Sequence, residues 1–396
     1  MTAYYFVQPL DVLMLRGNKG FGDAGEHGEA VMPPWPSLFA GAFRSALLSG
    51  DAGRLAQFVA LGTSRDLSAD AQREQTRALL GEALFKSLGT PNQPGDFRIT
   101  WVSLARCING AVFAAVPLPA DLAAFDEPGM ESLIPLRPAP LPLGVEANGA
   151  LPITALLRTP KLVKQSAGRW LDGHGLAAHL SGAVPASTSG TDALYKRETR
   201  LGIALDPGSR TASEGALYTT EAVAMREDAG FLVGIEGDHG QLPDSGLLRL
   251  GGDGKGAHYR MAREFSAPAP TAVNPGGRFR LILSTPGIFT GGWLPEYVIR
   301  QKTGEHRMQA PGFGARLACA ALARHEVISG WDLAHWRPKT AQRVAPAGSV
   351  YWFDEFSGDA GKLAAWVAGG LWGDNPDIQR RAEGFNRAWL AAWSES

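Results

Sequence analysis

The chain has 396 residues, more than a single domain usually holds, so we expect two domains. Hydrophobic residues make up 45% and charged residues 19% of the sequence, which indicates a packed globular protein and excludes a disordered one. The formal net charge is −1, so any site for a polyanion must come from local clustering of charge rather than from the global balance.

The cysteines and the N-terminal segment indicate the cellular compartment in which the protein works. Cys107 and Cys319 lie far apart and form no CxxC pair, which favours a reducing compartment and argues against a thiolate metal site. The start MTAYYFVQPLDVL lacks the features of a signal peptide, and no run of 18 uncharged apolar residues occurs. We expect a cytoplasmic chain with no membrane contact, no metal and no cofactor.

The N-terminal third predicts alternating strands and helices. Residues 3–15 are rich in aromatic and aliphatic residues and predict a strand, which a glycine-rich loop from Arg16 to about Val31 follows. A helix is expected after Pro36, with Ser37 as its N-cap and Gly50 at its end. Residues 51–89 are expected to be helical and peripheral.

A hairpin signal follows. Residues 97–107 and 111–119 read as two strands joined by Asn109-Gly110, which suits a type I′ turn. The order strand, helix, strand, strand is the opening of a ferredoxin-like β-α-β-β-α-β unit, a fold that RNA-recognition modules also use. Residues 119–215 lack clear periodicity and predict a long insertion.

Strand signals return after the insertion. Strands are expected at 216–225 and 230–237, and a second unit is expected to begin near residue 247. Its predicted strands are 278–289, 326–333 and 348–353, and its predicted helices are 313–324 and 360–370. We therefore predict an α+β protein of two ferredoxin-like domains, 1–240 with the insertion about 119–215, and 241–396.

Charge is not spread evenly along the insertion. Basic residues outnumber acidic ones between 151 and 210, whereas acidic residues dominate between 111 and 150. A basic inserted loop in a neutral chain is what a localised polyanion site requires, and an ordinary solvated surface loop is the equally weighted alternative.

Two glycine-rich stretches invite a nucleotide interpretation. GFGDAG at 20–25 matches G-x-G-x-x-G, but the expected helix begins a dozen residues too late and the ribose-binding acid is missing. GGDGKG at 251–256 fails both a P-loop and a paired-carboxylate metal site. The stretch is therefore interpreted as a glycine-rich loop that carries the cation Lys255. Such a loop either binds a phosphate group or is a plain turn between two strands.

The histidines form no recognisable metal motif. The eight histidines contain no HExxH and no His/Cys cluster, so a structural zinc is not expected. His27, in the first glycine loop, is the one histidine we would test as a general acid or base of a nuclease.

Several segments resemble the RAMP superfamily of CRISPR-associated proteins. LDVLMLRGNKGFG followed by MPPWPSLFAGAFRSALL resembles the entry of RAMP proteins, and RETRLGIALDPGSRTASEGALYTTEAV resembles their thumb hairpin. LRLGGDGKGAHYR, LSTPGIFTGGWLP and GWDLAHWRPKTAQRVAPAGSVYWF are similar to the second half of the third-numbered subunit family of the type III-B Cmr effector complex. The similarity covers most of the chain in the right order.

The resemblance implies a non-catalytic, RNA-binding subunit with two ferredoxin-like domains. Such subunits cap the 5′ tag of the CRISPR RNA (crRNA) beside the large cyclase-like (polymerase-like) subunit and the first backbone RAMP subunit, and meet target RNA only indirectly. RAMP proteins usually end with a glycine-rich loop, whereas this chain offers only RRAEGFNRAWLAAW. The alternative is a metal-independent RAMP endoribonuclease that processes repeat RNA through His27.

Candidate RNA-binding residues follow from the basic segments and the resemblance together. They are the cations of the first glycine loop and the first helix, two lysines of the insertion, the cations of the thumb and the cation of the second glycine loop: Arg16, Lys19, Arg44, Lys161, Lys164, Lys196, Arg197, Arg200, Arg210 and Lys255. Arg44 is as consistent with an ion pair at the core edge, and Trp293 is expected in the core rather than stacked on a base.

Overall fold

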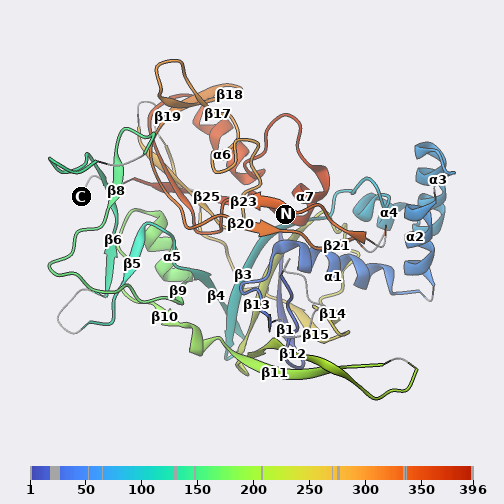
Figure 1. Cartoon of the computed structure of the whole chain (residues 1–396). Coiled ribbons are helices and arrows are strands. Elements are labelled where there is room, and N and C mark those ends of the chain that lie inside the picture. The colour runs from blue at the N-terminus through green and yellow to red at the C-terminus, as the bar shows by residue number, and fades with distance from the viewer. Residues whose placement is uncertain are drawn as a thin grey trace.

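The computed structural model describes residues 2–17, 27–51, 53–64, 66–127, 132–146, 149–206, 208–269, 271–273, 277–332, 335 and 337–393. Two large antiparallel sheets dominate these residues, one of eight and one of six strands, and helices cover their outer faces (Figure 1). The chain is thus a mixed protein of helices and antiparallel sheets, as predicted at that coarse level.

The first sheet is built on a split β-α-β unit. Strands β1 (Ala3–Pro9) and β3 (Arg98–Ile108) both pair antiparallel with β13 (Ala229–Glu236), so they run parallel to each other with β13 between them. Helix α1 (Pro36–Leu48) lies in the connection between them, and its apolar side is buried. Pro36 occupies the first turn after the N-cap Trp35, so Ser37 is not the cap.

Further strands extend this sheet on both sides. Beyond β3 lie β4 (Ala111–Pro117), β9 (Arg169–Asp172) and β10 (Ser189–Gly190). Beyond β1 lie β15 (Gly256–Met261) and β14 (Ser245–Arg249). Because β14 and β15 belong to the first sheet, this sheet runs past residue 240.

Local signals in the first half match the structure well. The β3–β4 turn places Asn109 at φ 51° and Gly110 at φ 89°, both left-handed, as a type I′ hairpin requires. Residues 51–89 supply three peripheral helices, namely α2 (Arg54–Thr63), α3 (Ala69–Leu80) and α4 (Glu82–Leu88). These helices gather at one end of the molecule (Figure 1).

The second sheet repeats the strand order of the first. Its order is β17 (Val298–Arg300), β18 (His306–Ala310), β19 (Phe313–Ala321), β24 (Val350–Gly358), β16 (Phe279–Leu283) and β25 (Ala388–Ala392). When β16, β19, β24 and β25 are numbered 1 to 4 along the chain, they lie side by side in the order 2-3-1-4. Strands β1, β3, β13 and β15 of the first sheet lie in the same order. The shared order reveals a structural repeat that the sequence hides.

The helices of the second sheet differ from those predicted. The expected helix 360–370 is confirmed as α6 (Ala360–Ala368), which Asp359 caps through the backbone N–H groups of Gly361 and Lys362. The expected helix at 313–324 is wrong, because these residues form β19. Phe313, Ala315 and Leu317 alternate inward with period two and pair with β24, which outweighs the helix propensity of the alanines.

A long hairpin projects from the body of the molecule. Strands β11 (Tyr195–Leu205) and β12 (Ala212–Met225) form it, and β2 (His27–Gly28) adds to β12 in parallel (Figure 1). We call this pair of strands the thumb hairpin. The rest of the predicted insertion supplies β9 and β10 to the first sheet and also forms a helix, a 3-10 turn and four further short strands: α5 (Gly173–Leu180), the turn Thr191–Ala193, β5 (Leu122–Ala124), β6 (Leu133–Pro135), β7 (Arg137–Ala139) and β8 (Thr154–Leu156).

Short elements of the second half connect the two sheets. They are β20 (Glu326–Ile328) paired with β23 (Gln342–Val344), β21 (Trp331–Asp332) paired with β22 (Arg337–Pro338), and helix α7 (Ile378–Glu383). Helix α7 contacts both α1 and β3 of the first half.

Side chains of opposite strand faces fill separate cores. Tyr5 and Val7 of β1 pack on the α1 side, whereas Phe6 between them joins a second core shared with Ile282 and Trp352 of the other sheet. The two sheets therefore pack against each other through a common apolar layer, which holds the sites below in fixed relative positions.

Candidate nucleic-acid interface

A groove of about 1140 Å³ lies between the two glycine-rich regions of the sequence. One wall is the end of the N-terminal strand segment, Met14 to Gly17, together with α1, and the other is the β14–β15 turn from Arg249 to Gly254. Trp331 of β21 and Lys339 close it on the side of the second sheet.

Glycine is required where these two regions meet. The Gly252 N–H donates to the Met14 carbonyl at 2.9 Å, and Gly251 is left-handed at φ 82°. A Cβ on Gly251 would lie 2.8 Å from the same carbonyl oxygen. The GGDGKG stretch therefore forms the tight turn between β14 and β15, as one of the two predicted alternatives had it, and it packs on the end of the N-terminal strand segment at Met14. Residues of this turn also line the groove.

The described part of the groove lining carries more positive than negative charge. Within that part, Arg16, Arg249 and Lys339 line the groove together with the single carboxylate of Asp253. Lys339 also forms an ion pair with Glu383. The indole of Trp331 has an exposed fraction of 51%, so a large aromatic face lies at the rim. Aromatic faces beside cations are what unpaired bases and a phosphate backbone need.

The sequence reasoning missed Trp331 as a candidate. It considered Trp293 and expected that residue in the core, which is wrong, because Trp293 is 38% exposed, with its ring 6.2 Å from that of His306. Trp331 stands in the quoted stretch GWDLAHW, but no local pattern distinguishes an exposed tryptophan there from a core one. Its position depends on β21 reaching across to α1.

The thumb hairpin divides its side chains between two faces. Lys196, Glu198 and Arg200 alternate onto one face, where Arg200 pairs with Glu198 at 3.4 Å, and the residues directly opposite on β12 share this face. The other face carries Leu201, Ile203 and Leu217, which are 72%, 41% and 51% exposed. Arg210 lies exposed near the tip, with a left-handed φ of 56°. The hairpin thus exposes two cations and one carboxylate on one face, and on the other face exposed apolar side chains beyond the Arg197–Glu221 pair.

Arg197, at the base of the thumb hairpin, is held by hydrogen bonds within the protein. Its Nη1 donates to Glu221 Oε2 at 2.8 Å and to the Ala30 carbonyl at 2.8 Å. The Ala30 N–H in turn donates to Glu221 at 3.0 Å, and Ala30 forms a β-bridge with Arg16. This clasp joins the closing end of the first glycine loop, and with it Arg16, to the thumb hairpin.

Part of the first glycine loop lies outside the described residues. That part includes Lys19 and the whole GFGDAG stretch. The backbone of His27 forms β2, where it pairs with Thr219, while its side chain is outside the description. The predicted roles of Lys19 and His27 stay predictions.

Three predicted cations lie away from the groove lining. Lys161 pairs with Glu127 at 2.5 Å on the insertion, and Lys164 is exposed nearby. Lys255 pairs with Asp11 across the β1–β15 edge, so the carboxylate of the same chain already engages it. The structure does not bring these three together with Arg16.

Arg44 lies on α1 and faces a second cavity, on the side of α7. Its guanidinium carbon lies 5.5 Å from the centre of the Phe97 ring, and no ion pair of Arg44 occurs among the described residues. Burial lowers the pKa of Arg44, an effect that the more distant Glu383 partly opposes. The predicted alternative of an ion pair at the core edge is therefore not what the described residues form.

The C-terminal stretch that stands where RAMP proteins have a glycine-rich loop is buried. Phe385 and Asn386 are fully buried, and the Asn386 side chain accepts from the Ile288 N–H at 2.6 Å and donates to its carbonyl at 3.0 Å. This segment therefore holds the second half together and offers no open loop.

No group of three or more His, Cys, Asp or Glu side chains is placed to hold a metal ion within the ranges given above. Within the same ranges, no helix has the length and apolar character needed to cross a membrane.

Two of the solved structures that this chain resembles are of the type III-B Cmr-beta complex. A chain of the type III-B Cmr-beta complex bound to cognate target RNA aligns with a TM-score of 0.50 and 12% identity, covering 97% of this chain and 96% of that one. A chain of the same complex bound to cognate target RNA and AMPPnP aligns at 0.48 and 13%, covering 97% and 95%. At such identities the likeness bears on the fold alone.

The sequence comparisons give a family. A search of curated proteins finds no significant match. A family model described as the CRISPR-associated protein Cas_Cmr3 matches residues 5–393, nearly the whole chain, so the resemblance predicted from the sequence is confirmed and the chain belongs to the Cas_Cmr3 family of CRISPR-associated proteins.

Proposed function

We propose that this chain is a non-catalytic, RNA-binding subunit of a type III-B CRISPR effector complex, where it caps the 5′ tag of the crRNA. In this proposal it bridges the large cyclase-like subunit to the backbone RAMP subunit and meets target RNA only indirectly. The family membership supports the assignment to the complex. The observation that carries the RNA role is the thumb hairpin, which joins exposed cations to an exposed apolar face.

The two sheets suit this role as two ferredoxin-like units. The shared strand order of second, third, first and fourth supports this assignment. The first unit keeps the helix between its first two strands, α1, and the second keeps the helix between its last two strands, α6. We place the division between them after Met261, where β15 ends, rather than after residue 240.

Physical chemistry connects the hairpin to single-stranded RNA. Phosphates are neutralised by lysine and arginine, which makes the affinity depend on salt, and splayed bases pack on exposed apolar or aromatic side chains. Lys196, Arg200 and Arg210 offer the first contact, and Leu201 and Ile203 the second. The groove between the glycine-rich regions continues this surface through Arg16 and the clasp at Ala30.

Charge reversal on the hairpin tests the proposal. The triple variant Lys196→Glu, Arg200→Glu and Arg210→Glu should weaken binding of the host's crRNA tag at least tenfold in near-physiological salt. The slope of log affinity against log salt should become shallower by about 2, since three phosphate contacts at about 0.7 each are lost. Fluorescence anisotropy with labelled single-stranded RNA at several salt concentrations measures both quantities.

The design leaves Arg197 unchanged, because its contacts with Glu221 and Ala30 hold the fold. A matched control reverses three exposed cations elsewhere, Arg263→Glu, Lys302→Glu and Arg324→Glu, and should alter affinity far less. Equal losses in both triple variants, or no loss in either, would refute the role of the hairpin. Copurification from the native host, with identification of bound RNA and subunits, tests the partners.

A further inference from the structure

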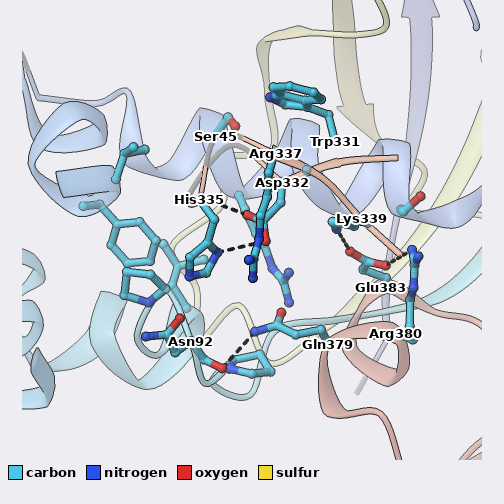
Figure 2. Close-up of a pocket in the computed structure, with 18 of the residues that line it drawn as sticks. Ser45, Asn92, Trp331, Asp332, His335, Arg337, Lys339, Gln379, Arg380 and Glu383 are labelled. Atoms are coloured by element: carbon cyan, nitrogen blue, oxygen red, sulfur yellow. Dashed lines mark hydrogen bonds and ion pairs between the residues drawn. The ribbon is translucent and has the colours of Figure 1, made fainter. Parts of the chain in front are cut away.

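A second cavity, of about 590 Å³, lies where the two sheet-bearing halves of the chain meet. Its first wall comes from α1, α2 and the loop after α4, and its second from the β21–β22 hairpin and α7 (Figure 2). The Gln379 amide donates to the Asn92 carbonyl at 3.1 Å across one edge. A ligand in this cavity would touch both halves at once, and the volume is in the range of small-molecule sites.

The carboxylates of the cavity wall are already engaged. Asp332 accepts from His335 at 2.9 Å, and Glu383 pairs with Lys339 and with Arg380, the latter at 3.1 Å (Figure 2). Asp377 caps α7 by accepting the backbone N–H groups of Gln379 and Arg380 at 3.1 and 3.0 Å. Among the described lining residues, these three carboxylates are the only acidic groups, so none is left over for another cation.

Arg44 is the unsatisfied group of the cavity. Its Nε and Nη2 atoms are buried and have no hydrogen-bond partner. The guanidinium lies over Phe97, which covers one face but accepts no ordinary hydrogen bond. A buried charge without a partner costs several kcal/mol, and a guanidinium presents five donors in a planar fork that suits phosphate oxygens. Arg337, a second guanidinium, also lines the cavity.

We propose that this cavity is a binding site for one phosphate group, carried by a mononucleotide or by RNA, with Arg44 as its principal ligand. The missing negative charge of the cavity is then supplied by the ligand. Hydroxyls of Ser37 and Ser45 on the same helix, which also line the cavity, can complete the contacts. The site deepens the proposed RNA binding and rests on it only for the source of the phosphate.

Arg44→Met provides the central test with the full-length chain. Inorganic phosphate, AMP and adenosine are titrated while the melting temperature is followed, and AMP binding is measured by calorimetry. The melting temperature of the wild type should rise with phosphate and with AMP but not with adenosine. Arg44→Met should melt at or above the wild-type temperature without ligand, since an unpaired buried charge is removed, and should bind AMP at least tenfold more weakly.

Two further variants keep the test decisive. Arg263→Met removes an exposed arginine that pairs with Asp244 and should respond to phosphate like the wild type. Gly41→Leu keeps Arg44, and a Cβ there meets no atom within 4 Å, so this variant should fold. Its side chain narrows the cavity and should weaken AMP binding at least tenfold even if Arg44→Met misfolds. Equal phosphate responses in the wild type, Arg44→Met and Gly41→Leu would overturn the site, as would no response in the wild type.

Competition identifies the source of the phosphate. Short single-stranded RNA that displaces AMP from the wild type but not from Arg44→Met assigns the site to an RNA phosphate, and AMP binding that RNA does not compete with assigns it to a free mononucleotide. The thumb triple variant should keep its AMP binding. Loss of RNA binding without loss of AMP binding would therefore refute the proposed function and leave this site standing.

Discussion

Single residues decide where the two halves of the chain touch. Gly384 ends α7 with a left-handed φ of 91°, and a Cβ there would come within 2.9 Å of both Cβ and the carbonyl oxygen of Ile99 in β3. The Gly384 carbonyl accepts from the Thr285 hydroxyl at 2.8 Å. Close approach of the backbone therefore requires glycine at this one position of the C-terminal stretch.

Gly384→Ala should lower the free energy of unfolding by about 2–5 kcal/mol. Left-handed strain contributes about 1–2 kcal/mol, and forcing a methyl group against the backbone of β3 adds about 1–3 kcal/mol. Gly240→Ala is the matched control, because Gly240 has a similar φ of 72° but a Cβ there meets no atom within 4 Å. Urea denaturation of both variants measures the difference, and equal losses would show that the contact with Ile99 contributes nothing.

At the scale of elements, structure that depends on local sequence was predicted well, whereas structure that depends on long-range strand pairing was not. The Asn109-Gly110 turn and α1 were predictable because turn chemistry and apolar spacing lie within a dozen residues. Residues 313–324 were mispredicted because their alanines favour a helix locally, whereas pairing with β24 some 35 residues away makes them a strand. The sequence of residues 313–324 alone does not reveal that β24 pairs with this segment.

The thumb hairpin exposes large apolar side chains that contribute little to the stability of the fold. Leu201→Thr combined with Ile203→Thr keeps β-branched or strand-compatible side chains while removing exposed apolar area. The free energy of unfolding should stay within about 0.5 kcal/mol of the wild type, since both side chains are exposed. RNA affinity should fall about tenfold, equivalent to about 1.4 kcal/mol.

Anisotropy with the crRNA tag and urea denaturation together check this double variant. Leu143→Thr, at another fully exposed leucine, serves as the control and should change neither quantity. A double variant that binds RNA like the wild type would mean that the apolar face of the hairpin serves some other contact.

At the scale of the whole molecule, the candidate sites were only partly predictable. The cluster of cations at 196–210 could be read from composition, and so could the glycines of both loops. The groove could not, because Met14 and Gly252 meet only after β1 and β15 pair. Arg44 was named as a candidate, but the burial of its Nε and Nη2 atoms without a partner depends on β21 and α7, which begin about 290 and about 335 residues further along the chain.

A buried charge network also joins distant parts of the chain. Asp121, which precedes β5 in the insertion, accepts from His179 of α5 at 2.9 Å and from Arg280 of β16. Arg280 also donates to the His179 carbonyl at 2.6 Å. All three side chains are more than nine-tenths buried. The insertion is thereby anchored to the second sheet, whereas the sequence predicted only a long insertion without clear periodicity.

The network should appear in the pH dependence of stability. Burial alone would raise the pKa of Asp121, but His179 and Arg280 outweigh it and hold the pKa below its usual value. A carboxyl whose pKa is lowered by folding stabilises the protein above its unfolded pKa, near 4, and this contribution is lost as the pH falls further. Asp121→Asn should lower the free energy of unfolding at pH 7 by about 3–5 kcal/mol, because it leaves Arg280 buried without its anion.

Between pH 4 and pH 2, the stability of the Asp121→Asn variant should fall less steeply than that of the wild type. Urea denaturation across pH 2–7 measures both effects, with the exposed Asp253→Asn as a control that should follow the wild type. Parallel curves for Asp121→Asn and the wild type would mean that Asp121 does not carry this acid-sensitive link between the insertion and the second sheet.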